Sequence, residues 1–114
     1  MIEKQLLKGS LKSIILKLLK ENDRMYGYEI TRTIEKMTGG EVTLTLGALY
    51  PILHKLEAEG DLITESEIVN SRTRVYYKLT KKGFTTADIK IGELKAYIET
   101  ITKFLNSDYG YAIG

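Results

Sequence analysis

Apolar residues near the C-terminus recur with alternating steps of four and three residues. These residues form one apolar seam, which consists of Ala87, Ile91, Leu94, Ile98, Ile101 and Leu105. A period of 3.5 residues predicts a helix that packs lengthwise against another helix, here over about residues 81–106, with Thr80 as its N-cap. A chain of 114 residues offers this helix no obvious partner of its own. The simplest partner is the same helix of a second subunit.

Two shorter helical patterns stand at the start of the chain. The first covers about residues 3–21 and places Leu and Ile at three- and four-residue steps, beginning with Leu7 and Leu11. The second covers about residues 26–37 and ends at Gly39 and Gly40, because glycine commonly terminates helices. Both patterns are amphipathic and predict helices that cover a common core.

A third helix is predicted over about residues 46–59, with Thr45 as its N-cap and Gly60 as its stop. Its buried stripe consists of Leu49, Leu53 and Leu56. Pro51 is tolerated near the start of a helix, where its missing N–H has no intrahelical partner. Its position leaves two alternatives: the helix begins at Leu46, or it begins slightly later and Leu46 belongs to the preceding loop.

A β-hairpin is predicted between the third and the last helix. Residues 62–69 and 73–79 are rich in Ile, Val, Tyr and Thr, and Asn70 and Ser71 separate them as a turn. Three short helices followed by a hairpin have the order of a winged helix-turn-helix, in which the third helix enters the DNA major groove and the hairpin forms the wing. We therefore expect a mainly α fold with a small β-hairpin and a C-terminal dimerisation helix.

The predicted division of the chain follows from this order. Residues 1–80 form the winged helix-turn-helix domain, residues 81–107 the dimerisation helix and residues 108–114 a tail. Basic residues gather in the second half of the hairpin and just after it, at Arg72, Arg74, Lys78, Lys81 and Lys82, with no acidic residue between Asn70 and Lys82. Since these five positive charges exceed the net charge of +2, they mark a phosphate-binding surface.

Composition argues against several other classes of protein. The chain has no Cys and one His, which leaves too few ligands or bases for a zinc site or a His-based acid–base mechanism. It contains no phosphate-binding loop and no metalloprotease motif, so we expect neither an enzyme nor a cofactor. Its longest strongly apolar stretch, residues 13–19, is too short to span a membrane. A cytoplasmic protein is the simplest expectation.

Three motifs occur in order along the chain. They are Met25-Tyr-Gly-Tyr-Glu-Ile30, Leu46-Gly-Ala-Leu-Tyr-Pro-Ile-Leu-His-Lys-Leu-Glu57 followed by Gly60, and Arg72-Thr-Arg-Val-Tyr-Tyr-Lys-Leu-Thr-Lys-Lys-Gly83. Together they resemble the PadR family of bacterial and archaeal transcription regulators over about residues 4–105. The length and the single C-terminal helix resemble the short-form members.

The resemblance implies a homodimeric DNA-binding repressor. In many members of the family a small molecule relieves the repression. It places the recognition helix at residues 46–59 and the wing tip around residues 70–74. It also implies that the first and last helices build the dimer, which points to Leu7, Leu11, Ile91, Leu94, Ile98, Ile101 and Leu105. The operator is then expected to be an inverted repeat.

The candidate DNA contacts come from the third helix and the wing. They are Thr45, Gly47, Ala48, Tyr50, His54, Lys55, Arg72, Arg74 and Lys78. For the arginines the alternative is a solvated hairpin tip, and for Lys55 a solvated helix face. Tyr50 either packs at the edge of the core alone or also directs its hydroxyl at a phosphate. His54 is expected on the helix surface rather than as a metal ligand.

Three departures from the family pattern bear on these expectations. Ala48 stands where the family often has Thr or Ser, and Val75 stands where it often has a basic residue. These two departures support an alternative, a winged-helix protein–protein adaptor that does not read DNA. Drug-binding members can use a tryptophan on the last helix, and this chain has none. Tyr97 and Phe104 are candidates to line an effector pocket, the alternative being ordinary packing.

Overall fold

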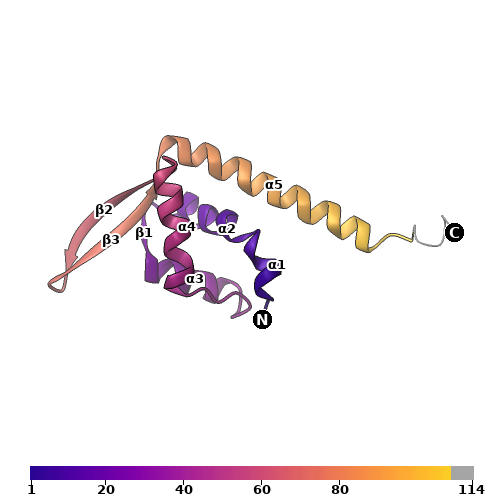
Figure 1. The fold of residues 1–114 in the computed structure, drawn as a ribbon, viewed down its shortest axis with the longest axis horizontal. Helices are drawn as coiled ribbons and strands as arrows, with labels where there is room; N and C mark the ends of the chain where they lie inside the picture. Colours follow the sequence, from indigo (N-terminus) through magenta and orange to yellow (C-terminus); the bar gives the residue numbers. More distant parts are fainter. Residues whose placement is uncertain (109–114) are drawn as a thin grey trace.

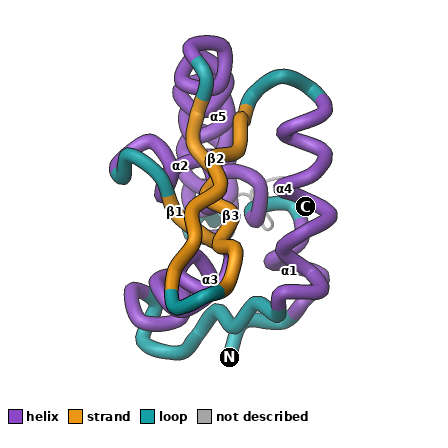
Figure 2. Tube along the Cα trace, turned by 90° about the vertical axis from the view of Figure 1, so that its left-hand side faces the viewer, coloured by secondary structure: helices purple, strands orange, loops and turns teal. Residues whose placement is uncertain are grey.

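The computed structural model describes residues 1–108 of the chain. Five helices and three strands follow one another in the order α1, α2, β1, α3, α4, β2, β3 and α5 (Figures 1 and 2). Their bounds are α1 Lys4–Lys8, α2 Leu11–Glu21, β1 Met25–Tyr26, α3 Gly27–Met37, α4 Leu46–Ala58, β2 Leu62–Val69, β3 Arg72–Leu79 and α5 Lys81–Leu105. The predicted class, mainly α with a small β-hairpin, is confirmed. The predicted tail lies outside the described residues except for Asp108.

One apolar core joins α2, α3, α4, the base of the sheet and the start of α5. The predicted stripe of α4 supplies three fully buried leucines to it, Leu49, Leu53 and Leu56. From α3 come Ile30 and Ile34, while the exposed Met37 at its end does not take part. The core therefore anchors α4 along one side and leaves its opposite side accessible.

The first predicted helix is divided in two. Helix α1 ends at Lys8, Gly9 is its C-cap, and α2 begins at Leu11. Glycine lowers helix stability by about 1 kcal/mol relative to alanine, so a break at Gly9 is inexpensive. The prediction of one continuous helix over residues 3–21 was therefore wrong, although Leu7 and Leu11 are both half-buried and Leu7 packs against the core.

The sheet has three strands in the order β1-β3-β2, all antiparallel. Asn70 and Ser71, with φ of 51° and 63°, form the predicted turn; both are left-handed, as a tight two-residue hairpin turn requires. Tyr26 does not begin a helix as predicted, because Met25 and Tyr26 form a short strand that pairs with Tyr77 and Tyr76 of β3. This short strand ties the hairpin to the helical body.

Helix α4 begins at Leu46 in spite of Pro51, so the predicted start is confirmed and the alternative that leaves Leu46 in the preceding loop is excluded. The hydroxyl of Thr45 accepts a hydrogen bond from the backbone N–H of Ala48, 3.2 Å away, and caps the helix as predicted. Pro51 removes only the bond to the carbonyl of Gly47, four residues earlier, and Gly47 is exposed to water. The helix therefore tolerates a proline in its second turn.

Helix α5 packs against the body with its first half only. Ala87 is buried and Ile91 lies against the core, whereas the second half projects from the body (Figure 1). The radius of gyration is 17.1 Å, compared with about 13 Å for a compact chain of this length. Within residues 1–108, no helix combines the length and the apolar character that crossing a membrane would need.

Candidate nucleic-acid interface

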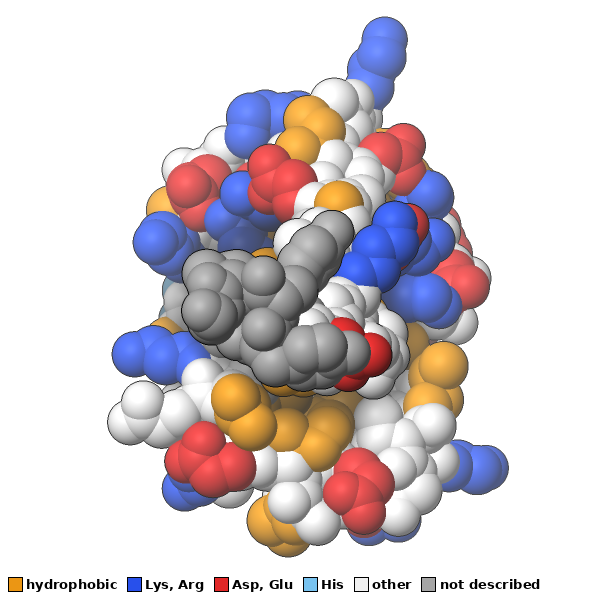
Figure 3. Space-filling view, turned by 90° about the vertical axis from the view of Figure 1, so that its right-hand side faces the viewer, with side chains coloured by type: hydrophobic (Ala, Val, Ile, Leu, Met, Phe, Trp, Pro, Cys, Tyr) orange, Lys and Arg blue, Asp and Glu red, His pale blue; other side chains and the backbone are white. Residues whose placement is uncertain are grey.

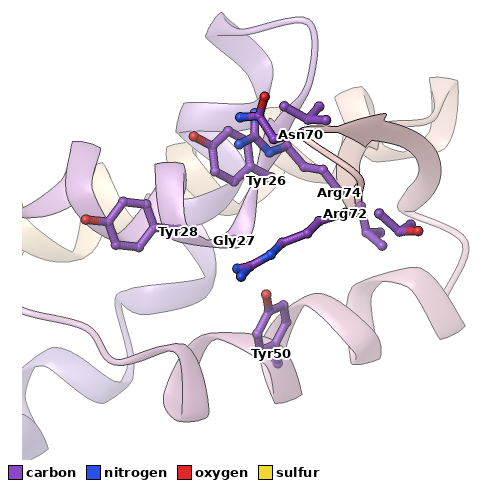
Figure 4. A pocket seen from close by; sticks show the side chains of 10 residues that line it. Tyr26, Gly27, Tyr28, Tyr50, Asn70, Arg72 and Arg74 are labelled. Carbon is purple, nitrogen blue, oxygen red and sulfur yellow. The ribbon is translucent and has the colours of Figure 1, made fainter.

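A cleft of about 800 Å³ lies between the wing, the start of α3 and the exposed side of α4 (Figure 4). Its walls include Tyr26, Gly27, Tyr50, Arg72 and Arg74. Strand β1 pairs with β3 only as far as Tyr76, so beyond that point the edge of β3 faces the cleft. In Figure 4, Arg72 extends towards the space above Tyr50. The cleft thus brings two predicted arginines and one predicted α4 residue together.

Two arginines and two tyrosines interleave where β1 meets β3, and we call Arg24, Tyr26, Arg74 and Tyr76 the arginine–tyrosine ladder. The guanidinium carbon of Arg74 lies 4.1 Å from the ring centroid of Tyr26, and that of Arg24 lies 3.9 Å from the centroid of Tyr76. The two rings meet edge to face at 5.6 Å. A hydrogen bond with Tyr76 raises the pKa of Arg74 above its ordinary value and outweighs the opposite effect of desolvation. The ladder holds the guanidinium of Arg74 in place.

Folding neutralises part of the basic cluster that the sequence places at the wing. Nζ of Lys78 lies 3.6 Å from Asp23, and Nζ of Lys82 lies 2.9 Å from Asp61. Two glutamates of β2 lie opposite Tyr76 and Arg74 in the sheet, but both pair with Arg24 instead. Among residues 1–108, Arg72 and Arg74 have no acidic partner within 4.0 Å, so these two carry the free positive charge of the wing.

The exposed side of α4 offers few polar groups near its start. Gly47 and Ala48 are exposed and have no polar side-chain atoms, and the hydroxyl of Thr45 is already an acceptor in its cap. Tyr50 packs against Gly27, where an added Cβ would lie 2.7 Å from the Tyr50 hydroxyl oxygen. The ring of His54 stacks on Tyr50, with centroids 5.8 Å apart. Tyr50 therefore both sets the spacing of α3 and α4 and presents its hydroxyl to the cleft.

A buried carboxylate joins the end of α4 to the start of α5. Asp61 is 2% exposed and accepts hydrogen bonds from Lys82 Nζ at 2.9 Å and from Thr86 Oγ1 at 2.6 Å. Burial raises the pKa of Asp61, but these two hydrogen bonds and the charges of Lys82 and Lys12 outweigh it and lower the pKa below its ordinary value. Its carbonyl also accepts from the backbone N–H of Thr80 at 3.0 Å. Asp61 therefore fixes how α5 leaves the wing.

A family model for PadR-like transcriptional regulators matches residues 15–88, a span that runs from within α2 to the start of α5. The chain belongs to the PadR-like family of transcriptional regulators. It is 30% identical over 104 residues to an uncharacterised protein of Lysinibacillus sphaericus, covering 90% of this chain and 84% of that protein. It is 36% identical over 75 residues to the transcriptional regulator YqjI of Escherichia coli, which covers 66% of this chain and only 34% of YqjI.

Solved structures agree with this assignment. A transcriptional regulator from Clostridium thermocellum superposes with a TM-score of 0.81 at 28% identity, covering 90% of this chain and 99% of that one. The PadR-like chain therefore has a winged-helix regulator fold, and both its family and this structural neighbour are described as transcriptional regulators. No group of three His, Asp or Glu side chains that could hold a metal ion occurs within residues 1–108 of the regulator.

The residues predicted for dimerisation occupy two different environments in the PadR-like regulator. Ile91 and Leu94 are half-buried against its own body, whereas Ile98 is 54% exposed and Leu105 is 73% exposed. Figure 3 looks at the face of the molecule from which α5 projects, and several hydrophobic side chains are visible on this face. Further large exposed apolar residues on α1 and the second half of α5 are Leu6, Tyr97, Ile101 and Phe104.

The two residues predicted for an effector pocket are not brought together. Tyr97 lines a groove of about 500 Å³ between α5 and the segment from α1 to the start of α2, together with Leu6 and Leu94. Phe104 does not line this groove and is 73% exposed.

Sequence reasoning missed two functional candidates of the PadR-like regulator, Arg24 and Tyr26. Both belong to the ladder, and Tyr26 also lines the cleft. The signal was the apolar Met25 between Arg24 and Tyr26, a short alternation that is compatible with a strand. Because α3 begins directly after Tyr26, the helical pattern of α3 masks this short strand in the sequence.

Proposed function

We propose that this chain is a homodimeric DNA-binding regulator that represses transcription by occupying an inverted-repeat operator. The observation that carries the proposal is the cleft in which Arg72 and Arg74 face the exposed side of α4. Unpaired arginines beside a helix that can enter the major groove provide a phosphate contact next to a base-reading element. The DNA is then contacted by α4 and its N-cap, through Thr45, Gly47, Ala48, Tyr50, His54 and Lys55. Lys78 adds a contact at the base of the wing.

The two parts of the chain have different roles in the proposed dimer. Residues 1–80 contact DNA, and residues 81–107 form the dimerisation helix through the exposed part of its seam. A second copy would cover the apolar surface of Ile98, Ile101 and Leu105, together with the helices that carry Leu7 and Leu11. Two such copies related by a two-fold axis present two copies of α4 to one face of DNA. A dimer lying across two adjacent major grooves blocks access to that stretch of promoter.

Effector binding is proposed for the groove beside Tyr97 and not for Phe104 by itself. A small molecule in this groove would contact both α1 and α5, and through them the dimer.

The adaptor alternative keeps one supporting observation, namely the lack of polar side-chain atoms at Gly47 and Ala48. Direct base reading by α4 is therefore sparse, and we expect DNA shape to provide more of the discrimination.

The experiment is a gel-shift with DNA flanking the gene, followed by footprinting on the bound fragment. Half-site centres should lie about 10 base pairs apart or a multiple of it. Moving the half-sites apart by about five base pairs turns one to the opposite face of the helix, so binding should fall to the non-specific level. Equal binding to both spacings would favour the adaptor or a non-specific DNA-coating protein.

A further inference from the structure

A second positively charged cleft lies on the flank of α4 that faces away from the wing. It has a volume of about 310 Å³ and a floor of Pro51, Ile52 and Leu56. Three lysines and one glutamate surround this floor, namely Lys8, Lys12, Lys55 and Glu59. Figure 1 shows α4 between the wing on one side and α1 on the other, so the two clefts border the same helix on opposite flanks.

The charge of this second cleft is only partly neutralised inside the chain. Lys12 Nζ lies 3.8 Å from the carboxylate of Glu59. Within residues 1–108, Lys8 and Lys55 have no acidic group within 4.0 Å, and both residues are exposed. The cleft therefore has a net positive charge at the surface, although its three lysines come from three different elements.

The position of Lys55 on α4 shows which flank of the helix the second cleft occupies. At about 100° per residue, Lys55 lies roughly 140° around the helix from Tyr50, which lines the wing cleft. A helix with its side chains is about 10–12 Å across, close to the width of the major groove. When such a helix enters the groove, each flank faces one of the two phosphate backbones that border it.

We propose that Lys8, Lys12 and Lys55 form a second phosphate-binding surface, which contacts the DNA backbone on the side of the major groove opposite the wing. This inference rests on the proposed DNA-binding function and adds α1 and α2 to the interface. Contacts on both backbones fix the depth and the tilt of α4 in the groove. That positioning matters in a protein whose base-reading residues have so few polar atoms.

The salt dependence of binding to a mixed-sequence duplex of about 30 base pairs tests this surface, because phosphate contacts do not depend on sequence. Fluorescence anisotropy of the full-length chain between about 50 and 200 mM salt gives the slope of log K against log salt. Lys8→Gln and Lys55→Gln should each reduce the magnitude of this slope by about 0.9 for every phosphate that the lysine neutralises in the wild type. Both residues are exposed, so the thermal unfolding midpoint should stay unchanged.

Two further variants complete the test. One is a matched control, and the other should change the salt slope in the opposite direction. Lys17→Gln removes the same charge from α2 at a side chain that pairs with Glu21 at 2.6 Å, and it should leave the slope unchanged. Glu59→Gln removes the acidic neighbour of Lys12 and should make the slope steeper and the affinity higher. If Lys17→Gln reduces the slope as much as Lys8→Gln, the effect is one of net charge, and the proposed surface is wrong.

The outcome also separates this inference from the function on which it rests. If Arg72→Ala weakens binding while Lys8→Gln and Lys55→Gln do not, DNA is contacted on the wing side only, and the second surface is overturned. If the wild-type chain binds neither this duplex nor the DNA flanking its gene, the proposed function itself fails. An unchanged slope for Glu59→Gln removes Lys12 from the surface.

Discussion

Arg74 of the wing lies over the ring of Tyr26, with its guanidinium carbon 4.1 Å from the ring centroid. Tyr26 ends the strand that leads into α3, so this contact connects the wing to the first helix of the helix-turn-helix. A guanidinium held against a ring keeps its edge available for hydrogen bonds to a phosphate while its flexible chain is restrained. The wing arginine is therefore positioned before DNA arrives.

Replacing Tyr26 tests this positioning. Tyr26→Ala should weaken DNA binding about two- to fivefold, because a cation–π contact at an exposed site is worth about 0.5–1 kcal/mol. Tyr26→Phe retains the ring and should bind like the wild type. Anisotropy titrations measure both affinities, and far-ultraviolet circular dichroism checks that the helices remain. An equal fall in affinity for both variants would show that the hydroxyl, not the ring, matters.

The removal of the Asp61 charge should destabilise the fold and change its response to acid. Because the pKa of Asp61 is lowered in the folded chain, its stabilising effect is present above the ordinary value of 3.8 and is lost as the pH falls through the folded value. Asp61→Asn should reduce the free energy of unfolding by about 1–3 kcal/mol at neutral pH. Urea titrations at several pH values should show this difference shrinking below about pH 4.

Asp88→Asn is the matched control for Asp61→Asn. Asp88 pairs with Lys20 at the surface, where an ion pair contributes about 0–1 kcal/mol. Its replacement should leave nearly unchanged both the free energy of unfolding at neutral pH and the way this free energy falls below about pH 4. If Asp88→Asn and Asp61→Asn behave alike, the buried cluster around Asp61 does not have the role assigned to it.

Two glycines of α5 should respond in opposite directions to the same change. A Cβ at Gly83 would overlap the backbone carbonyl oxygen of Asp61, so Gly83→Ala should destabilise the fold by about 1–3 kcal/mol. Gly92 has no neighbour within 4 Å of such a Cβ, and Gly92→Ala should stabilise the helix by about 0.5–1 kcal/mol. Thermal unfolding compares them directly. A stable Gly83→Ala would contradict the close approach of α5 to Asp61.

A charge in the exposed part of the seam should separate the proposed dimer without damaging the subunit. Ile98 is 54% exposed in the single chain, so Ile98→Glu leaves its core intact, whereas a charge at half-buried Leu94 would also disturb the body. Sedimentation velocity should report a monomer for Ile98→Glu. Thr100→Glu, on the other side of α5, should remain dimeric. A dimeric Ile98→Glu would move the interface away from this seam.

The parts of the fold that depend on near neighbours could be predicted from the sequence. Thr45 and Thr80 cap their helices as predicted, and Asn70 with Ser71 makes the predicted turn. The buried stripe of α4 also follows from its spacing. Each of these features depends on hydrogen bonds or helical phase within a few residues, so the local sequence contains the information that determines it.

Contacts between distant segments decided the rest of the site. Charge counting along the chain placed Lys78 and Arg74 in one basic cluster, but folding pairs Lys78 with Asp23 and stacks Arg74 on Tyr26. The strand at Met25 exists because β3 offers its edge there, which local propensity does not report. A sequence pattern records which residues are apolar or charged. Only the packed chain sets which charges meet, and hence which remain free for a partner.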